Sequence, residues 1–235
     1  MNYVISDIHG CYSEFLKLLD KISFSEEDHL YILGDVLDRG FDPIGALLNI
    51  MDRKNVTYIL GNHDFLLYSM VQRFGINLCD FKCEDDKWDI RLWLLDGGIP
   101  TMDSFLELSE ETRWKVAEYL SDASLYEVIE NSRGKFILSH AGIDNFEEGK
   151  ELSDYNLYDF IYCRMNYNKR LFKDENTYLV TGHTPTPTIR MDKKPLVFEE
   201  NGYIAVDCGC VFGGKLAAYC LDTGEITYVD KEEIK

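Results

Sequence analysis

Residues 30–40 read Leu-Tyr-Ile-Leu-Gly-Asp-Val-Leu-Asp-Arg-Gly, and the fold class can be inferred from this segment. Its apolar run, Leu30 to Leu33, leads directly into a glycine and then into a cluster of charged side chains. A short aliphatic run bounded by glycine is typical of a strand that is buried on both faces. The stretch therefore predicts a buried strand whose carboxyl end carries Asp35, Asp38 and Arg39 into a polar loop.

The same arrangement recurs along the chain. Further apolar runs of this kind are Tyr3–Ile5, Val56–Leu60, Phe136–Leu138, Tyr178–Val180 and Tyr203–Val206, and they lead into SDIHG, GNHD, SHAG, TGHT and DCG. Residues 13–22 carry an apolar stripe at helical spacing, and Asp42-Pro43 is a favourable helix start, with aspartate as the N-cap. This β-α-β-α-β order predicts a largely parallel opening half with right-handed crossovers.

Residues 65 to about 130 interrupt the alternation of strands and helices. Segments 65–74, 88–95 and 112–120 have helical patterns, so we predict a helical insertion after the third strand. From about Thr177 the chain is expected to form strands, with a turn at Thr223-Gly224. Because no repeat or Pro/Gly/Ser-rich linker divides the sequence, we expect one α/β domain over residues 1–235.

The composition limits the classes of partner. The chain has 235 residues, of which 46% are hydrophobic and 28% charged, as in a soluble globular protein. Its 42 acidic and 24 basic residues give a net charge of −18, which argues against nucleic-acid or membrane partners. The first residues lack the basic region of a signal peptide, and no apolar run approaches the ~20 residues of a membrane span, so we expect a cytoplasmic protein.

The seven cysteines fit free thiols in a reducing compartment. The pairs Cys79-x3-Cys83 and Cys208-x-Cys210 have no second cysteine or histidine pair at zinc-finger spacing. We therefore expect buried or half-buried thiols there rather than a metal site.

Histidines are placed unusually along this chain. A lone histidine at a strand end is most often packed or hydrogen-bonded, but four of the five histidines follow strand ends: His9, His63, His140 and His183. Asp7, Asp35 and Asn62 occupy the same level, and the carboxyl ends of parallel strands meet at one edge of a sheet. Such a patch of nitrogen and oxygen donors suits two divalent metal ions, which one carboxylate can bridge.

The ordered motifs DIHG (7–10), GDVLDRG (34–40), GNHD (61–64), SHAG (139–142) and TGHTP (181–185) resemble the calcineurin-like metallophosphoesterase superfamily. More narrowly, they are similar to the phosphoprotein phosphatase family in its small bacterial and phage form. Residues 94–98 with Thr101, and residues 207–209 with 213–216, resemble further segments of the phage-type enzymes. The resemblance implies a two-sheet β-sandwich flanked by helices.

The resemblance also implies a role for each motif residue. It implies that Asp7, His9 and His183 bind a first metal ion, that Asp35 bridges, and that Asn62 and His140 complete a second site. It implies that His63 is the general acid, held by Asp38, and that Arg39, Arg164 and Asn62 contact the substrate phosphate, with Arg170 as the alternative to Arg164. Manganese is the first expectation for the metal, with iron, zinc or cobalt as alternatives.

The expected activity is hydrolysis of phosphate monoesters, with a serine/threonine protein phosphatase as the main hypothesis and a phosphorylated protein or small phosphoester as substrate. The alternative is a symmetrical diadenosine tetraphosphate hydrolase, because GNHD and His140-Ala141-Gly142-Ile143 resemble those enzymes. The intact Asp38-Arg39-Gly40 motif and the short chain favour the phosphatase. A third hypothesis is a non-catalytic phosphate-binding protein. Such a protein would lack one of the metal-ligand residues, and this sequence has a residue at every expected ligand position.

Overall fold

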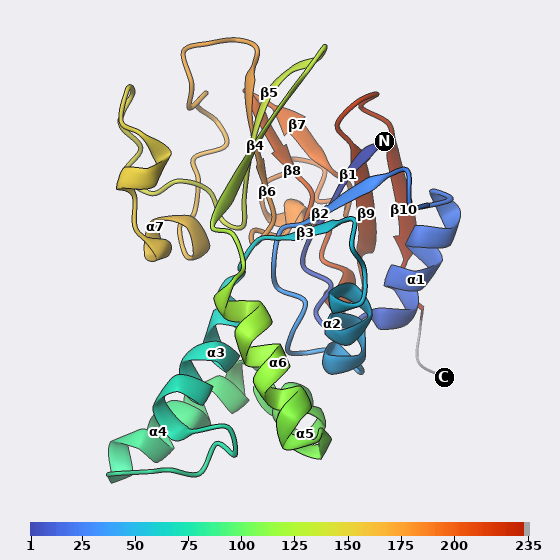
Figure 1. The fold of residues 1–235 in the computed structure, drawn as a ribbon. Helices are drawn as coiled ribbons and strands as arrows, with labels where there is room; N and C mark the ends of the chain where they lie inside the picture. The colour runs from blue at the N-terminus through green and yellow to red at the C-terminus, as the bar shows by residue number, and fades with distance from the viewer. Residues whose placement is uncertain (233–235) are drawn as a thin grey trace.

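The computed structural model describes residues 1–232, which form two five-stranded sheets (Figure 1). The first sheet has the order β10-β9-β1-β2-β3, in which β1, β2 and β3 are parallel, as predicted, β9 pairs antiparallel with β1, and β10 pairs antiparallel with β9. The strands are β1 (Asn2–Ile5), β2 (His29–Ile32), β3 (Val56–Tyr58), β9 (Lys215–Cys220) and β10 (Ile226–Asp230).

The second sheet has the order β4-β5-β6-β8-β7. Its three inner strands are parallel to one another, and an antiparallel strand closes each edge. The strands are β4 (Tyr126–Asn131), β5 (Gly134–Ser139), β6 (Thr177–Thr181), β7 (Phe198–Glu200) and β8 (Tyr203–Ala205). The expected two-sheet sandwich is confirmed.

Two helices cover the outer face of the first sheet. They are α1 (Tyr12–Lys21) and α2 (Pro43–Met51), close to the predicted positions. The Asp42 side chain accepts a hydrogen bond from the backbone nitrogen of Gly45 (2.9 Å), which confirms the predicted N-cap. Both helices connect parallel strands, so they fix where the loops after β1 and β2 lie.

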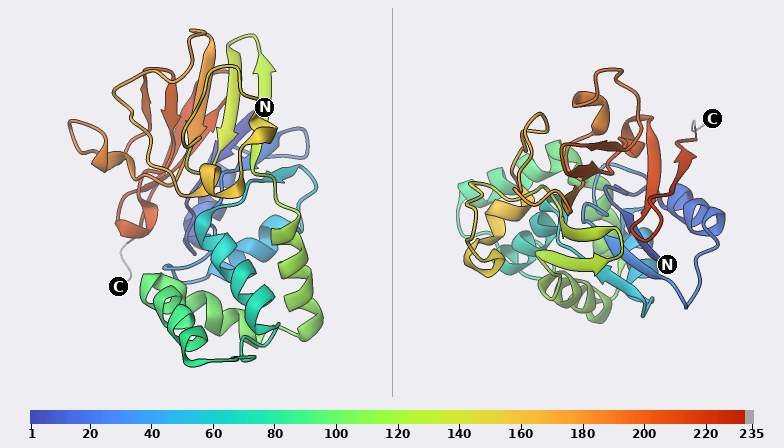
Figure 2. Two further views of the ribbon diagram at one scale, coloured as in Figure 1. Left: turned by 90° about the vertical axis from the view of Figure 1, so that its left-hand side faces the viewer. Right: turned by 90° about the horizontal axis from the view of Figure 1, so that it is seen from above.

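The segment after β3 is helical and extends away from the sheets (Figure 2). It contains α3 (Asn62–Phe74), α4 (Glu84–Trp93), a π-helical turn (Leu94–Gly98), α5 (Ile99–Glu107) and α6 (Glu110–Ser121). The helices end at Ser121, earlier than the expected boundary near residue 130, because β4 already begins at Tyr126. β4 is an edge strand whose side chains are exposed or half-buried, so it lacks the continuous apolar run of an inner strand.

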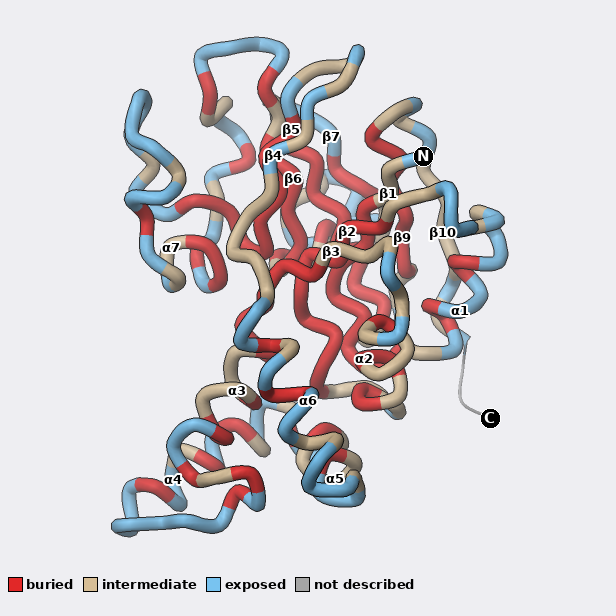
Figure 3. The backbone as a smooth tube through the Cα atoms, in the orientation of Figure 1, coloured by how far each residue is buried: buried red, intermediate tan, exposed pale blue. Residues whose placement is uncertain are grey.

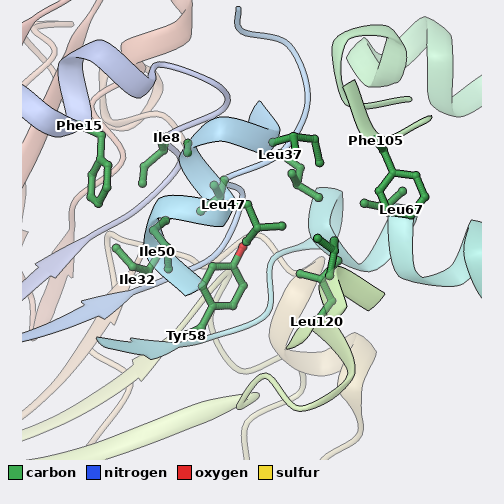
Figure 4. Packing of buried hydrophobic residues seen from close by; sticks show 14 of the residues in the cluster. Ile8, Phe15, Ile32, Leu37, Leu47, Ile50, Tyr58, Leu67, Phe105 and Leu120 are labelled. Atoms are coloured by element: carbon green, nitrogen blue, oxygen red, sulfur yellow. The ribbon is translucent and has the colours of Figure 1, made fainter. Parts of the chain in front are cut away.

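The helical segment shares one hydrophobic core with the first sheet. Figure 4 shows Phe15 and Ile32 in the same cluster as Leu67, Phe105 and Leu120. A second cluster fills the space between the two sheets and includes Val4, Leu33, Phe136, Val180, Ile204 and Tyr219. Figure 3 shows that burial is concentrated in the strands and in the loops at their carboxyl ends.

The outer face of the second sheet is covered by one short helix, α7 (Leu157–Ile161), together with loops. Among the described residues, no helix combines the length and apolar character that a bilayer crossing needs. All seven cysteines are free, as expected. Cys208 and Cys210 are buried, but the expectation was wrong for Cys79 and Cys83, which are exposed because they lie around the loop between α3 and α4.

Candidate functional site

The polar clusters after the strands meet around one cavity of about 380 Å³. The first sheet contributes Asp7 after β1, Asp35 after β2, and Asn62 and His63 at the start of α3. The second sheet contributes His183 after β6, while His140, after β5, is buried beside Asn62 without lining the cavity itself. The cavity is lined by Asp7, His9, Asp35, Arg39, Asn62, His63, Asp96, Tyr162, Arg164, His183, Pro185, Asp207 and Phe212.

Left-handed backbone conformations are concentrated at this site. Positive φ angles, which are uncommon outside glycine, occur at Asp7 (48°), His9 (42°), Asp35 (52°), Asp38 (68°), Arg39 (68°) and His183 (62°). Backbone hydrogen bonds between the two loops hold this arrangement, including His9 N to Asp35 O (2.9 Å) and Asp7 N to Gly34 O (3.1 Å). The loops therefore brace each other in conformations that each alone would disfavour.

Gly40, which ends the Asp38-Arg39-Gly40 motif, is required by this close approach. A Cβ atom at Gly40 would lie 2.0 Å from the carbonyl oxygen of His9. The final glycine of the motif thus lets the loop after β2 contact the loop after β1.

Asp64, where the resembling phosphatases have glutamate, clamps the loop after β2. Its buried carboxylate accepts hydrogen bonds from the backbone nitrogens of Asp35 (2.7 Å), Val36 (3.2 Å), Leu37 (3.2 Å) and Gly61 (3.1 Å). The shorter side chain therefore has a complete structural role here and leaves the neighbouring Asn62 and His63 facing the cavity.

The histidine tautomers leave nitrogen lone pairs that point to Asp35. Because a carbonyl can only accept, His9 Nδ1 donates to Leu37 O (2.7 Å) and His140 Nδ1 donates to Leu33 O (2.6 Å). Their Nε2 atoms each lie 3.5 Å from the same oxygen, Asp35 Oδ2. His140 Nε2 is also 3.0 Å from Asn62 Oδ1, so two acceptors face each other.

This arrangement fits metal ions, because a cation between facing acceptors satisfies both of them. Two overlapping groups of potential ligands share Asp35, one with His9 and His63, the other with His140 and His183. Asp7 lies outside both groups but lines the same cavity, and its Oδ2 accepts from His183 N (2.9 Å). The predicted ligands are thus brought together around Asp35.

The pKa shifts at the site are also those expected of residues that bind metal ions. Burial lowers the pKa of His9 to about 3 and that of His183 to about 3, and it lowers the pKa of His140, so these imidazoles are neutral, as metal binding requires. Burial and the charges of Asp207 and Asp35 raise the pKa of Asp7 well above its usual value. Burial and Asp35 raise the pKa of Asp207 to about 7. A divalent cation would relieve this crowding of carboxylates.

His63 differs from the other three histidines. Burial alone would lower its pKa, but the hydrogen bond with Asp38 and the charge of Asp35 outweigh that effect and raise it. His63 Nδ1 donates to Asp38 Oδ2 (2.7 Å), and the same oxygen accepts from Trp93 Nε1 (3.0 Å). Asp38 is fully buried, and its backbone nitrogen donates to Thr101 Oγ1 (2.8 Å).

Arg39 lies between two of the histidines. Its Nη1 is 2.5 Å from His9 Nε2, and its Nη2 is 2.6 Å from His63 Nε2. Its backbone nitrogen donates to Gly97 O (2.8 Å) in the π-helical turn, and Asp96 Oδ1 lies 3.8 Å from Nη2. One lone pair cannot both accept from Arg39 and bind a metal ion, so loading the site at His9 requires the guanidinium to move.

Of the two candidates for the second arginine, the structure brings only Arg164 to the cavity. Arg164 Nη1 donates to His183 O and to Thr184 Oγ1, both at 2.9 Å. Arg170 instead donates to backbone carbonyls of its own loop, among them Phe172 and Asp174. Arg170 is therefore a loop-bracing residue.

Sequence reasoning missed several residues of the site. They are Trp93, Asp96, Tyr162, Asp207 and Phe212. The similarity of residues 94–98 and 207–209 to family segments was the signal for Asp96 and Asp207. Trp93 gave none, since an apolar position on a helix does not reveal that its indole nitrogen donates to the Asp38 carboxylate.

Trp93→Phe should destabilise the protein by about 1–3 kcal/mol, because it removes a hydrogen bond to the buried Asp38 carboxylate. Trp88→Phe on the same helix is the matched control, and its 56% exposed side chain predicts a change within about 0.5 kcal/mol. Urea denaturation of both variants measures the difference. Equal stability of the two variants would show that the Trp93–Asp38 contact contributes nothing.

Comparison with known proteins gives a consistent family. The family described as calcineurin-like phosphoesterase matches residues 3–228. Bis(5'-nucleosyl)-tetraphosphatase PrpE, asymmetrical, of Geobacillus sp. (strain WCH70) is 29% identical over 92% of this chain and 88% of its own length. The protein of the same name from Bacillus subtilis (strain 168) is 26% identical over 92% and 88%. A symmetrical bis(5'-nucleosyl)-tetraphosphatase from Haemophilus ducreyi is 45% identical, but over 28% of this chain and 25% of its own length.

Solved structures show the same fold. The crystal structure of a protein described as a candidate diadenosine tetraphosphatase superposes with a TM-score of 0.66 at 20% identity, covering 98% of this chain and 93% of that one. A serine/threonine phosphatase from Saccharomyces cerevisiae gives a TM-score of 0.55 at 14% identity, covering 100% of this chain and 80% of that one. At these identities the superpositions establish the architecture alone.

Proposed function

The chain belongs to the calcineurin-like phosphoesterase family and is a metal-dependent phosphoester hydrolase, and on that premise we propose that it hydrolyses dinucleoside polyphosphates such as diadenosine tetraphosphate. The observation that carries the proposal is the name shared by the relatives that align along the whole chain. This favours the alternative hypothesis over the protein phosphatase, which is not supported by these relatives.

The comparisons also favour asymmetrical over symmetrical cleavage of the dinucleotide. The relatives matched over nearly the whole chain are named asymmetrical, whereas the symmetrical relative from Haemophilus ducreyi aligns over about a quarter of its length. The short length of the chain does not argue against a nucleotide substrate either, since the chain spans 88% of the length of the asymmetrical relatives. We therefore propose cleavage into unequal products, a nucleoside monophosphate and a nucleoside triphosphate.

Enzymes of this family use two divalent metal ions. In this chain, Asp7, His9 and His183 would hold one ion, Asn62 and His140 the other, and Asp35 both. When bound, the ions supply an activated water and neutralise charge on the phosphoryl oxygens. Manganese stays the first candidate for the metal. Iron, zinc and cobalt stay alternatives, because the oxygen and nitrogen donors of this site also accept them.

The side chains of the protein supply the remaining chemistry. Arg39 and Arg164 both line the cavity, and in this proposal they bind oxygens of the attacked phosphate. His63, held in one tautomer by Asp38, donates a proton to the leaving oxygen. The oxygen of water bonds to the phosphorus next to one nucleoside and its protons pass to solvent. The phosphoanhydride bond breaks, the leaving nucleoside triphosphate takes the proton of His63, and solvent then reprotonates His63. A cytoplasmic location and the absence of nucleic-acid partners stay predictions.

The test compares two substrates with the manganese-loaded enzyme. We expect kcat/KM for diadenosine tetraphosphate to exceed that for a phosphoserine peptide by at least about tenfold, which corresponds to about 1.4 kcal/mol. Chromatography should find AMP and ATP in equal amounts. A higher value for the peptide would return the assignment to protein phosphatase, and ADP as the only product would return it to symmetrical cleavage.

A further inference from the structure

A second cavity adjoins the candidate catalytic cavity. It has a volume of about 500 Å³ and is lined by apolar and small residues, chiefly Pro185, Pro187, Pro195, Gly209, Phe212 and Gly213. Pro185 and Phe212 line both cavities, so the two adjoin at these residues. We call this second cavity the proline groove.

Phe212 stands at the junction of the two cavities. It ends a 3-10 turn (Cys210–Phe212) that is flanked by two glycines in left-handed conformation, Gly209 and Gly213. Its side chain is 66% exposed, although it is large and apolar. The Arg39 guanidinium lies 5.5 Å from the centre of its ring. An exposed aromatic ring is thus held beside a residue proposed to bind phosphate.

We propose that the proline groove binds the nucleoside of the substrate and that its base stacks on Phe212. This inference rests on the proposed function, since it requires a nucleotide substrate. The junction places a stacking surface directly beside the arginine that would bind the adjoining phosphate, in the order in which a nucleotide carries base and phosphate. The groove volume lies within the range of about 300–1,000 Å³ that is usual for small-molecule sites.

The cavity wall at Phe212 and Pro185 differs in character from the wall at Asp96 and His63. The groove opens past Phe212 and Pro185, while Asp96 Oδ2 lies 3.8 Å from His63 Nε2, the atom that would protonate the leaving group. Arg39 lies beside both Phe212 and His63, with Nη2 2.6 Å from His63 Nε2, so with the nucleoside in the groove it would contact the adjoining phosphoryl group. This arrangement favours attack at the phosphate next to the bound nucleoside.

The test uses inhibition of p-nitrophenyl phosphate hydrolysis by AMP and by inorganic phosphate with the metal-loaded enzyme. AMP should bind at least tenfold more tightly than phosphate to the unaltered protein. Phe212→Ala should weaken AMP about tenfold, or about 1.4 kcal/mol, as loss of one stacked base predicts, and leave phosphate unchanged. Phe212→Tyr should retain AMP binding, because it keeps a stacking ring.

Phe41→Ala is the matched control, since Phe41 is 87% exposed and lines a separate cavity with Tyr12 and Leu16. It should leave both inhibition constants unchanged. Equal weakening of AMP and phosphate by Phe212→Ala would overturn the proposal, because Phe212 would then act through Arg39. AMP binding no tighter than phosphate to the unaltered protein would also overturn it.

Failure of the proposed function would be recognised separately. It would appear in the unaltered protein as a lack of diadenosine tetraphosphate hydrolysis. The ratio of the inhibition constants of AMP and phosphate tests nucleoside binding in the proline groove, and this measurement requires no cleavage of a dinucleotide.

Discussion

Asp35→Asn is expected to lower kcat/KM by about 10³-fold or more and to leave the purified protein with at most one of its two metal ions. Asp35 Oδ2 lies 3.5 Å from both His9 Nε2 and His140 Nε2, the only carboxylate oxygen in the described structure shared in this way. The amide carries no charge to compensate two divalent ions, and loss of several kcal/mol of transition-state stabilisation corresponds to this factor. Elemental analysis and phosphatase assays measure both effects.

The asparagine variant should still fold. Its side-chain oxygen can keep the hydrogen bond that Asp35 Oδ1 accepts from the backbone nitrogen of His63 (2.9 Å). Asp103→Asn, an exposed position on α5, controls for the exchange itself and should change neither metal content nor activity. Two metal ions per chain and near-normal turnover in Asp35→Asn would remove Asp35 from the bridging role.

His63→Asn is expected to lower kcat by roughly 10²–10⁴-fold while both metal ions stay bound, which is the usual contribution of a general acid. The loss should be larger for phenyl phosphate than for p-nitrophenyl phosphate, because the poorer leaving group depends more on protonation. A positional role without proton transfer would affect the two esters equally. Elemental analysis of the same preparation separates loss of acid catalysis from loss of metal.

A near-normal rate of His63→Asn on phenyl phosphate would contradict the role of His63. Loss of metal together with activity would instead make His63 a ligand. That outcome has a structural basis, since His63 lies in one group of potential ligands with His9 and Asp35.

The sequence predicted the residues that follow strands. A buried strand needs a continuous apolar run, so its end is visible, and a polar residue directly after it, such as Asp7, His140 or His183, is placed by topology alone. The predicted cap at Asp42 was equally local, since the side chain bonds within its own turn. These features depend on residues that are adjacent in sequence, so they can be predicted from the sequence alone.

Features that depend on distant contacts could not be predicted in this way. The strand β4 lies at a sheet edge and lacks an apolar run, and nothing in the apolar pattern of β9 tells that it pairs with β1. The role of Trp93 depends on the packing of α4 against Asp38, and that of Phe212 on a turn between glycines. Substrate choice belongs to this second class, because the motifs serve the phosphate and say little of the group attached to it.

The candidate centre lies where the loops of the two sheets meet, and its contacts join parts of the chain that are far apart in sequence. His140 Nδ1 contacts Leu33 O, 107 residues away, and Asp7 Oδ2 accepts from His183 N, 176 residues away. Neither the part that ends at Ser121 nor the part that begins at Tyr126 carries a full donor set. Turnover can therefore begin only after both ends of the chain have met. A fragment that stops at Ser121, or one that starts at Tyr126, is therefore expected to have no activity.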